Sequence, residues 1–204
     1  MSERPLIAGI VLAGGRSTRF GSDKALAKLA GRTLLDHCVS RLSPQVSQLL
    51  ISGRFAPVCP PDTPVLADPI NDRGPLGGIL AGLEWMAERE ETHLVSVAVD
   101  TPFFPCDLVE RLRDHASGDA PAISSQNKRL HPALALWPKA LRKELRAAIA
   151  SEPMSLRHFA FKLCNATVVD FDDAPQHAFF NINQPRDLLE AERIYSNQSS
   201  QNSL

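Results

Sequence analysis

The sequence predicts an α/β fold with a mainly parallel central sheet. Short apolar runs typical of buried strands cover residues 6–13, 48–52 and 94–100. Stretches with helical character lie between these runs, at residues 33–43 and 75–88. Because consecutive strand–helix–strand units connect parallel strands through right-handed crossovers, this order indicates a parallel sheet covered by helices.

The second half of the chain is less regular. Residues 120–125 and 131–137 have strand character and are close enough in sequence to form an antiparallel pair. The remaining expected elements are helices at residues 105–115, 139–150, 155–162 and 184–195, and a strand at residues 167–171. Residues 196–204 are polar and low in complexity, which predicts a disordered tail. We therefore expect a single domain over residues 1–195.

Composition limits the function classes. The 204 residues are 44% hydrophobic and 22% charged, with a net charge of −1, which is ordinary for one globular domain. The even spread of Lys and Arg argues against a nucleic-acid-binding or membrane-surface protein. The four cysteines lack zinc spacing, no signal peptide is recognisable, and no apolar run approaches the roughly 20 residues that cross a bilayer. These features predict a cytoplasmic protein with reduced cysteines.

The most specific segment spans residues 12–24, LAGGRSTRFGSDK. A strand ends here, and Gly14 and Gly15 let the backbone turn and approach a ligand closely, with successive N–H groups facing an anion. Three positive charges follow the glycines: Arg16, Arg19 and Lys24. The spacing matches neither the Walker A motif nor G-x-G-x-x-G. The pattern favours a triphosphate site, and a solvated surface loop is the alternative.

Two aspartates follow strand-like runs. Asp100 comes directly after the run at residues 95–99, and ligands of parallel sheets bind beyond the carboxyl ends of strands. A carboxylate there can face phosphates directly or through Mg²⁺, which prefers oxygen ligands. A turn or helix-capping aspartate before Thr101 is the alternative. Asp68 follows a second apolar stretch and precedes Pro69, with a loop aspartate as its alternative.

Four further residues have two interpretations. Asn181 and Asn183 precede a helical stretch, where Asn183 could simply cap the helix. His131 is either a satisfied histidine at a strand end or a ligand contact. Cys106 lies near a helix start but has no partner that would make it catalytic, so we interpret it as structural.

In order and spacing, these segments resemble the molybdenum cofactor guanylyltransferase family, within the wider nucleotidyltransferase group. The motifs are the loop at 12–24, GPLGGI at 74–79, DTPF at 100–103, His131-Pro132 and FNIN at 180–183. The chain departs from the family at Ser52-Gly53, where members often carry an asparagine that contacts the nucleotide. The resemblance implies a three-layer Rossmann-like nucleotidyltransferase fold. Its nucleotide-binding part would cover about residues 1–105, and its acceptor-binding part about 106–195.

The resemblance also implies a reaction: GMP is transferred from GTP to the terminal phosphate of molybdenum-molybdopterin, giving the guanine dinucleotide cofactor and pyrophosphate. The implied nucleotide-binding residues are Leu12, Ala13, Gly14, Gly15, Arg16, Lys24, Asp68 and Asp100. Lys24, Arg19 and Asp100 are the candidate catalytic residues, Asp100 the Mg²⁺ ligand, and Asn181 and Asn183 the acceptor contacts. Molybdenum-insertion proteins and apo-molybdoenzymes are the implied protein partners.

The choice of nucleotide and the assignment as an enzyme both have alternatives. Related cytidylyltransferases tend to show LAAG where this chain has LAGG, and the missing Cβ of Gly14 leaves room for a purine, which favours GTP over CTP. Alternative functions are a molybdopterin cytidylyltransferase and a sugar-phosphate nucleotidyltransferase. A non-catalytic cofactor-delivery protein is an alternative of another class, but it would need neither Lys24 nor Asp100.

Overall fold

The computed structural model describes residues 6–14, 24–53, 62–70 and 73–201, and its centre is a seven-stranded sheet in the order β5-β4-β1-β6-β8-β7-β9. The strands are β1 (Ile7–Leu12), β4 (Gln48–Ser52), β5 (Val65–Leu66), β6 (His93–Ala98), β7 (Ala122–Gln126), β8 (Arg129–Pro138) and β9 (Thr167–Asp170). Strands β5, β4, β1 and β6 are parallel, β9 is parallel to β7, and β8 runs antiparallel to both β6 and β7. The predicted mainly parallel sheet is confirmed.

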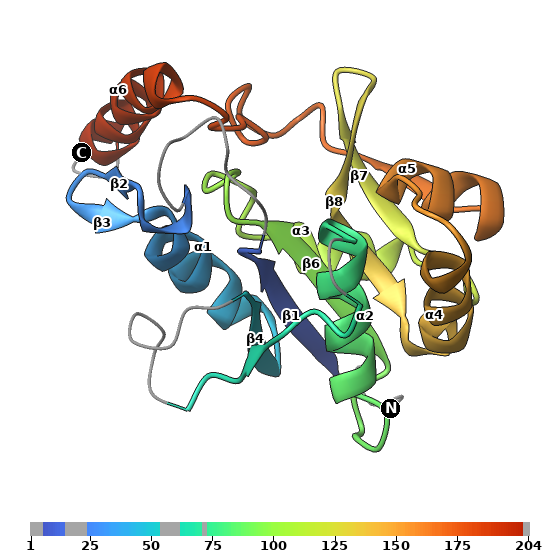
Figure 1. Ribbon diagram of the computed structural model, residues 1–204. Helices are drawn as coiled ribbons and strands as arrows, with labels where there is room; N and C mark the ends of the chain where they lie inside the picture. The colour runs from blue at the N-terminus through green and yellow to red at the C-terminus, as the bar shows by residue number, and fades with distance from the viewer. Residues whose placement is uncertain (1–5, 15–23, 54–61, 71–72, 202–204) are drawn as a thin grey trace.

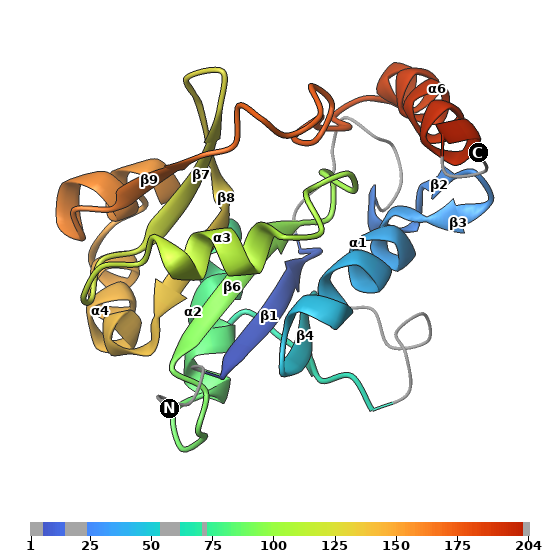
Figure 2. The same ribbon diagram turned by 180° about the vertical axis from the view of Figure 1, so that it is seen from behind.

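Helices cover both faces of this sheet, which gives the three layers (Figures 1 and 2). One face carries α1 (Leu34–Leu42) and α3 (Leu108–Asp114). The other carries α2 (Pro75–Trp85), α4 (Arg142–Ser151), α5 (Leu156–His158) and the π-helical turn η4 (Phe159–Leu163). Short 3-10 turns lie at η1 (Lys24–Leu26), η2 (Ser43–Gln45) and η3 (Lys139–Leu141). No helix in the described ranges is long and apolar enough to cross a membrane.

Strand β1 shows why both faces are covered. All six of its residues are buried. Successive side chains of a strand point to opposite faces. Accordingly, Ile7 and Val11 join the hydrophobic cluster under α1 and α3, whereas Ala8, Ile10 and Leu12 join the cluster under α2 and α4.

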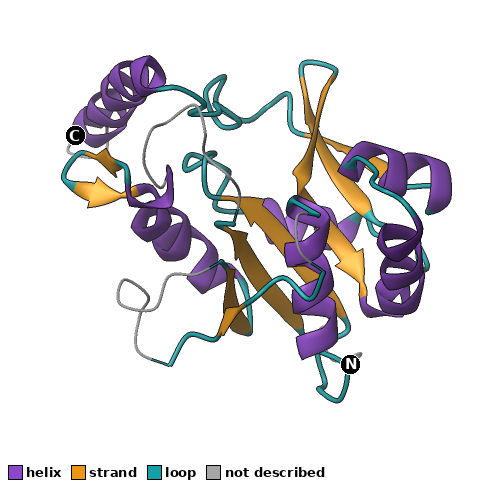
Figure 3. Ribbon diagram, in the orientation of Figure 1, coloured by secondary structure: helices purple, strands orange, loops and turns teal. Residues whose placement is uncertain are grey.

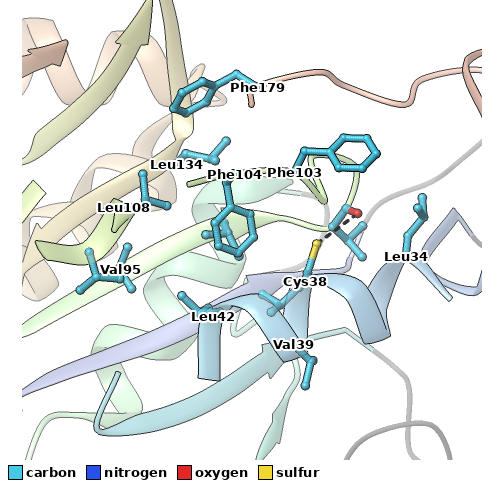
Figure 4. Close-up of a cluster of buried hydrophobic side chains, with 14 of the residues drawn as sticks. Leu34, Cys38, Val39, Leu42, Val95, Phe103, Phe104, Leu108, Leu134 and Phe179 are labelled. Atoms are coloured by element: carbon cyan, nitrogen blue, oxygen red, sulfur yellow. Dashed lines mark hydrogen bonds between the residues drawn. The ribbon is translucent and has the colours of Figure 1, made fainter. Parts of the chain in front are cut away.

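The cluster under α1 is shown in Figure 4, where Leu34 and Cys38 of the helix lie near Phe103 and Phe104 from the segment after β6. All four side chains are at most 4% exposed. The Cys38 thiol donates to the backbone oxygen of Val99 at 3.5 Å, and burial raises its pKa. Cys38 is therefore a protonated packing group.

The carboxyl ends of β1, β4 and β6 meet at one edge of the sheet. The ladder continues just beyond the strands, because Ala13 N donates to the Ser52 oxygen at 2.9 Å and Val99 N donates to the Leu12 oxygen at 3.2 Å. The loops that follow β6 and β9 run along this edge (Figure 3). Residues that come directly after these strands, Asp100 among them, are therefore brought together.

The C-terminal helix α6 (Pro185–Gln201) is longer than expected. The prediction of disorder from residue 196 is wrong as far as Gln201, and residues 202–204 lie outside the described chain. No glycine or proline follows Pro185 to end the helix, and Ser196 Oγ donates back to the Glu192 oxygen at 2.9 Å. A polar sequence is compatible with a helix when the helix packs along one side only.

One element was not expected from the sequence, the hairpin of β2 (Lys28–Leu29) and β3 (Arg32–Thr33). Its two turn residues, Ala30 and Gly31, both have positive φ, at 48° and 81°. The hairpin lies beside α6 in both ribbon views (Figures 1 and 2).

Candidate functional site

Asp100 is the centre of the site. Its Oδ2 accepts a hydrogen bond from Lys24 Nζ at 2.8 Å, and its Oδ1 accepts from Asn181 Nδ2 at 3.1 Å and from Thr101 Oγ1 at 3.3 Å. The side chains of Lys24 and Asp100 are only 15% and 20% exposed. Lys24 opens the turn η1, which is anchored by the fully buried Ala25. The charge pair is thus held in place and partly shielded from water.

The segment Asn181–Asn183 docks onto this pair although Asn181 and Asp100 are 81 positions apart. Ile182 N donates to the backbone oxygen of Asp100 at 2.8 Å, and Lys24 Nζ donates to Asn183 Oδ1 at 3.2 Å. The structure therefore brings together the predicted metal ligand, one predicted catalytic cation and both predicted acceptor contacts.

The amide of Asn181 is only half satisfied. Because an ionised carboxylate can only accept hydrogen bonds, the nitrogen of the amide must be the atom that faces Asp100. The oxygen Oδ1 is then buried, and among the described residues it has no hydrogen-bond partner. Buried acceptors are rarely left unpaired in native proteins. This atom therefore suits a ligand that supplies a proton donor or a cation.

The helix-cap interpretation of Asn183 does not match the contacts. Asp187 Oδ2 accepts from the backbone N–H groups of Asn183 and Gln184, at 2.8 and 2.9 Å. Asp187 therefore satisfies the free N–H groups before α6, and the side chain of Asn183 is left for Lys24.

On the other side of the edge, Asp68 lies next to the glycine loop. Ser52 Oγ donates to Asp68 Oδ1 at 3.1 Å. A Cβ added at Gly14 would lie 4.0 Å from Asp68 Oδ2. Burial raises the pKa of Asp68, and the hydrogen bond from Ser52 opposes that rise. No pattern in the sequence indicated this role of Ser52, which is the last residue of β4, whereas Asp68 lies two residues after β5, the strand that pairs with β4.

The start of α2 explains the second glycine motif. Gly74 precedes the helix with φ 55° and ψ −137°, a backbone conformation that residues with a Cβ avoid. A Cβ at Gly77 would lie 3.1 Å from Asp68 Oδ2, and one at Gly78 would lie 2.5 Å from Ser52 Oγ. The glycines let α2 begin directly against Ser52 and Asp68.

His131 has an aromatic partner. Its ring stacks on Phe179, with centroids 4.5 Å apart and an interplanar angle of 23°. Burial, and secondarily the positive charge of Arg129, lower the pKa of His131 to about 4. The imidazole is therefore neutral near pH 7. Whether it contacts the acceptor stays a prediction.

Comparison with known proteins identifies the family. Residues 9–167 match the MobA-like NTP transferase domain. The chain belongs to this family. It is 42% identical over 199 residues to the molybdenum cofactor guanylyltransferase of Rhizobium leguminosarum bv. trifolii, with 93% of each chain covered. It is 39% identical over 203 residues to that of a Bradyrhizobium species, with 92% of each covered.

A solved structure has the same fold. The molybdopterin-guanine dinucleotide biosynthesis protein A of Archaeoglobus fulgidus superposes with a TM-score of 0.71 at 22% identity, covering 94% of this chain and 100% of that one. The three-layer nucleotidyltransferase fold and the resemblance inferred from the motifs are confirmed.

Only part of the predicted glycine loop of this MobA-like NTP transferase is described. Gly15, Arg16 and Arg19 lie outside the described residues. Leu12 and Ala13 are each 6% exposed, and the N–H of Ala13 is already used by the sheet, so the first free backbone of the loop is at Gly14. In the described ranges, no three His, Cys, Asp or Glu residues gather as a metal cluster. A metal here would depend on few carboxylates.

Proposed function

We propose that this nucleotidyltransferase moves GMP from GTP to the terminal phosphate of molybdenum-molybdopterin, releasing pyrophosphate. The observation that carries the proposal is the docking of Asn181–Asn183 onto the Lys24–Asp100 pair at the carboxyl edge of the sheet. This contact joins a nucleotide-side loop to a segment of the other half of the chain, as a two-substrate transfer requires. The names of the curated relatives support the choice of GTP and molybdopterin.

The reaction needs positioning more than proton transfer. An oxygen of the acceptor phosphate attacks the α-phosphorus of GTP and forms the new P–O bond. The bond from the α-phosphorus to the bridging oxygen breaks, and its electron pair leaves with pyrophosphate. Because the second pKa of a phosphate monoester is about 6, the nucleophile is already ionised near pH 7. What the protein must supply is alignment and stabilisation of charge.

Lys24 and the two asparagines would provide that alignment. The Lys24 ammonium lies between Asp100 and Asn183, so it can stabilise negative charge at the reacting phosphate. Asn183, whose side chain is not used to cap α6, can turn towards the acceptor. Gly14 begins the backbone that would face the triphosphate.

Magnesium fits the donors at Asp100. Mg²⁺ takes oxygen ligands, commonly one or two carboxylates together with substrate phosphates. Asp100 supplies one carboxylate that already holds a cation, the Lys24 ammonium, and Asn181 supplies a buried oxygen without a partner in the described chain. Asp100 and Asn181 Oδ1 are therefore the atoms that would hold the ion. Bound there, it would neutralise phosphate charge.

Base selection has a structural basis at Gly14. A Cβ at this position would meet the protein only at ordinary contact distances, 3.8 Å from Ser52 Oγ and 4.0 Å from Asp68 Oδ2. Gly14→Ala should therefore fold normally while its methyl group fills space that a purine needs. We expect this variant to lose much of its preference for GTP over CTP.

The deciding experiment supplies purified protein with molybdenum-loaded molybdopterin, Mg²⁺ and one nucleotide at a time, and measures pyrophosphate. We expect release with GTP well above that with CTP, ATP or UTP, and a reduced GTP:CTP ratio for Gly14→Ala at unchanged melting temperature. A wild type that prefers CTP would make the protein a cytidylyltransferase. Tight molybdopterin binding with no release from any nucleotide would indicate a delivery protein.

A further inference from the structure

The hydrogen bond between Ser52 and Asp68 lies at the end of the short pairing between β4 and β5. Strand β5 has only two residues, and its pairing with β4 consists of Ile51 with Val65 and Ser52 with Leu66. Beyond this short ladder, Ser52 Oγ reaches the carboxylate of Asp68 at 3.1 Å. Among the described residues, this hydroxyl makes the only hydrogen bond to that carboxylate.

Ser52 itself offers a ligand little access. It is only 2% exposed, and its hydroxyl proton is used by Asp68. A methyl group at Gly78 would come within 2.5 Å of Ser52 Oγ, so α2 closes directly over the hydroxyl. The main route by which Ser52 can affect a bound nucleotide is therefore Asp68.

The surroundings of the carboxylate are asymmetric. On the side of α2, a Cβ at Gly77 would lie only 3.1 Å from Asp68 Oδ2, whereas one at Gly14 would lie 4.0 Å from the same atom. The tight side faces α2, and the side with more room faces Gly14. Among the described residues, Asp68 accepts a hydrogen bond only at Oδ1, so Oδ2 can accept from a group bound over Gly14.

We propose that Ser52 is a positioning residue for guanine selection, which fixes Oδ1 of Asp68 so that the carboxylate can accept from the N1–H and 2-amino groups of guanine. A carboxylate has about four acceptor positions, so the bond from Ser52 leaves enough for both guanine donors. Adenine and cytosine do not present two adjacent donors on this edge. The inference rests on the proposed use of GTP and assigns its base selection to a residue that departs from the family pattern.

The test compares GTP with inosine triphosphate, which lacks only the 2-amino group. Binding of each nucleotide is titrated without acceptor, and KM and kcat are then measured with it. For Ser52→Ala we expect GTP affinity to fall about threefold to tenfold, the range of one hydrogen bond, and the GTP:ITP ratio to fall with it. The kcat at saturating GTP and the KM for molybdopterin should stay unchanged.

Ser96→Ala is the matched control. Ser96 is also a fully buried serine of the central sheet, but its hydroxyl bonds to Ala133 and Trp137 on β8, away from Asp68. It should lower the melting temperature at least as much as Ser52→Ala and leave the GTP:ITP ratio at the wild-type value. Adding Ser52→Ala to Asp68→Asn should cause no further loss of GTP affinity, because Ser52 acts through that carboxylate.

Each outcome decides one point. A wild-type GTP:ITP ratio in Ser52→Ala, or an equal change in Ser96→Ala, would overturn the positioning role. A wild type that binds both nucleotides equally would overturn it too. A wild type that discriminates between them but transfers no GMP to molybdopterin would leave the role of Ser52 intact and overturn only the proposed function.

Discussion

The two sides of the site are built in different ways. The side that we propose for the nucleotide consists of the ends of parallel strands β1, β4 and β5, the start of α2, and glycines that allow close approach. The side that we propose for the acceptor comes from the antiparallel strands β7 and β8 and from the loop after β9. This loop is held by side chains: the His131–Phe179 stack and the bond from Asn181 to Asp100. The first side is therefore shaped mainly by backbone geometry, and the second is held mainly by side-chain contacts between residues far apart in the sequence.

This difference predicts which substitutions should affect one substrate more than the other. Asp100 contacts both, because its carboxylate accepts from Lys24 of the first side and from Asn181 of the second. Substitutions at Asp100 should therefore impair both substrates. Substitutions elsewhere should impair one substrate more than the other.

The largest effect is expected for Asp100→Asn. The variant removes the charge that pairs with Lys24 and the only carboxylate we assign to Mg²⁺, so kcat/KM should fall by about two to three orders of magnitude. Affinities for GTP and for molybdopterin should both weaken. Steady-state pyrophosphate release and separate binding titrations measure these effects.

Asp107→Asn serves as the control for Asp100→Asn, because the side chain of Asp107 is 54% exposed and lies at the start of α3. It should behave as wild type. Normal turnover of Asp100→Asn at ordinary Mg²⁺ concentration would remove Asp100 from the mechanism.

Lys24→Ala should produce the next largest loss. It deletes one charge-assisted contact, typically about 1.5–3 kcal/mol, or roughly ten- to over a hundredfold in GTP binding and the chemical step combined. Molybdopterin affinity should change less than GTP affinity. Lys28→Ala, an exposed lysine of the neighbouring strand β2, should leave both unchanged. Equal effects of the two lysine variants would show a general charge effect instead of a specific one.

Asn183→Ala tests the acceptor side and should have a smaller effect. We expect the KM for molybdopterin to rise about threefold to tenfold, GTP binding to stay near wild type, and the melting temperature to change little. Asp187→Ala should show the opposite pattern, because Asp187 holds the N–H groups before α6 and such caps stabilise by about 0.5–2 kcal/mol. If Asn183→Ala loses only stability, its assignment to the acceptor must be dropped.

The nucleotide side could be predicted from the sequence to a greater extent than the acceptor side. Its residues follow patterns that can be read locally. An apolar strand followed by a glycine turn is seen at β1 and Gly14, and an apolar strand followed by an aspartate is seen at β6 and Asp100. The continuous apolar run of β1 predicts a strand buried on both faces of a parallel sheet, and ligands bind beyond the carboxyl ends of such strands.

Long-range contacts could not be predicted in this way. The bond from Asn181 to Asp100 spans 81 positions, and the bond from Ser52 to Asp68 spans 16, so neither leaves a periodic signal. The β2–β3 hairpin was missed because its turn begins with Ala30 at positive φ, where asparagine or glycine is the usual signal. The helix continues to Gln201 because a polar composition is compatible with an exposed helix as well as with a disordered tail.

The last expected effects concern the pH dependence of stability, and they should differ in sign between the two sides. On the acceptor side, the pKa of His131 falls from 6.5 in a free side chain to about 4. Between these values the unfolded chain binds a proton that the folded chain does not, so the stability contributed by His131 is complete above pH 6.5 and is lost as the pH falls towards 4. On the nucleotide side, burial raises the pKa of Asp68 above 3.8. Its contribution to stability is therefore present at low pH and is lost as the pH rises through the folded-state pKa.

Urea unfolding of wild type, His131→Phe and Asp68→Asn from pH 4 to pH 8 measures both effects, because the other titrating groups are common to all three proteins. The advantage of wild type over His131→Phe should grow as the pH rises from 4 to 6.5 and then stay constant. The advantage of wild type over Asp68→Asn should instead shrink as the pH rises. The same sign for both variants would mean that the two sides do not differ in this way, and that burial does not dominate the ionisation of at least one of these residues.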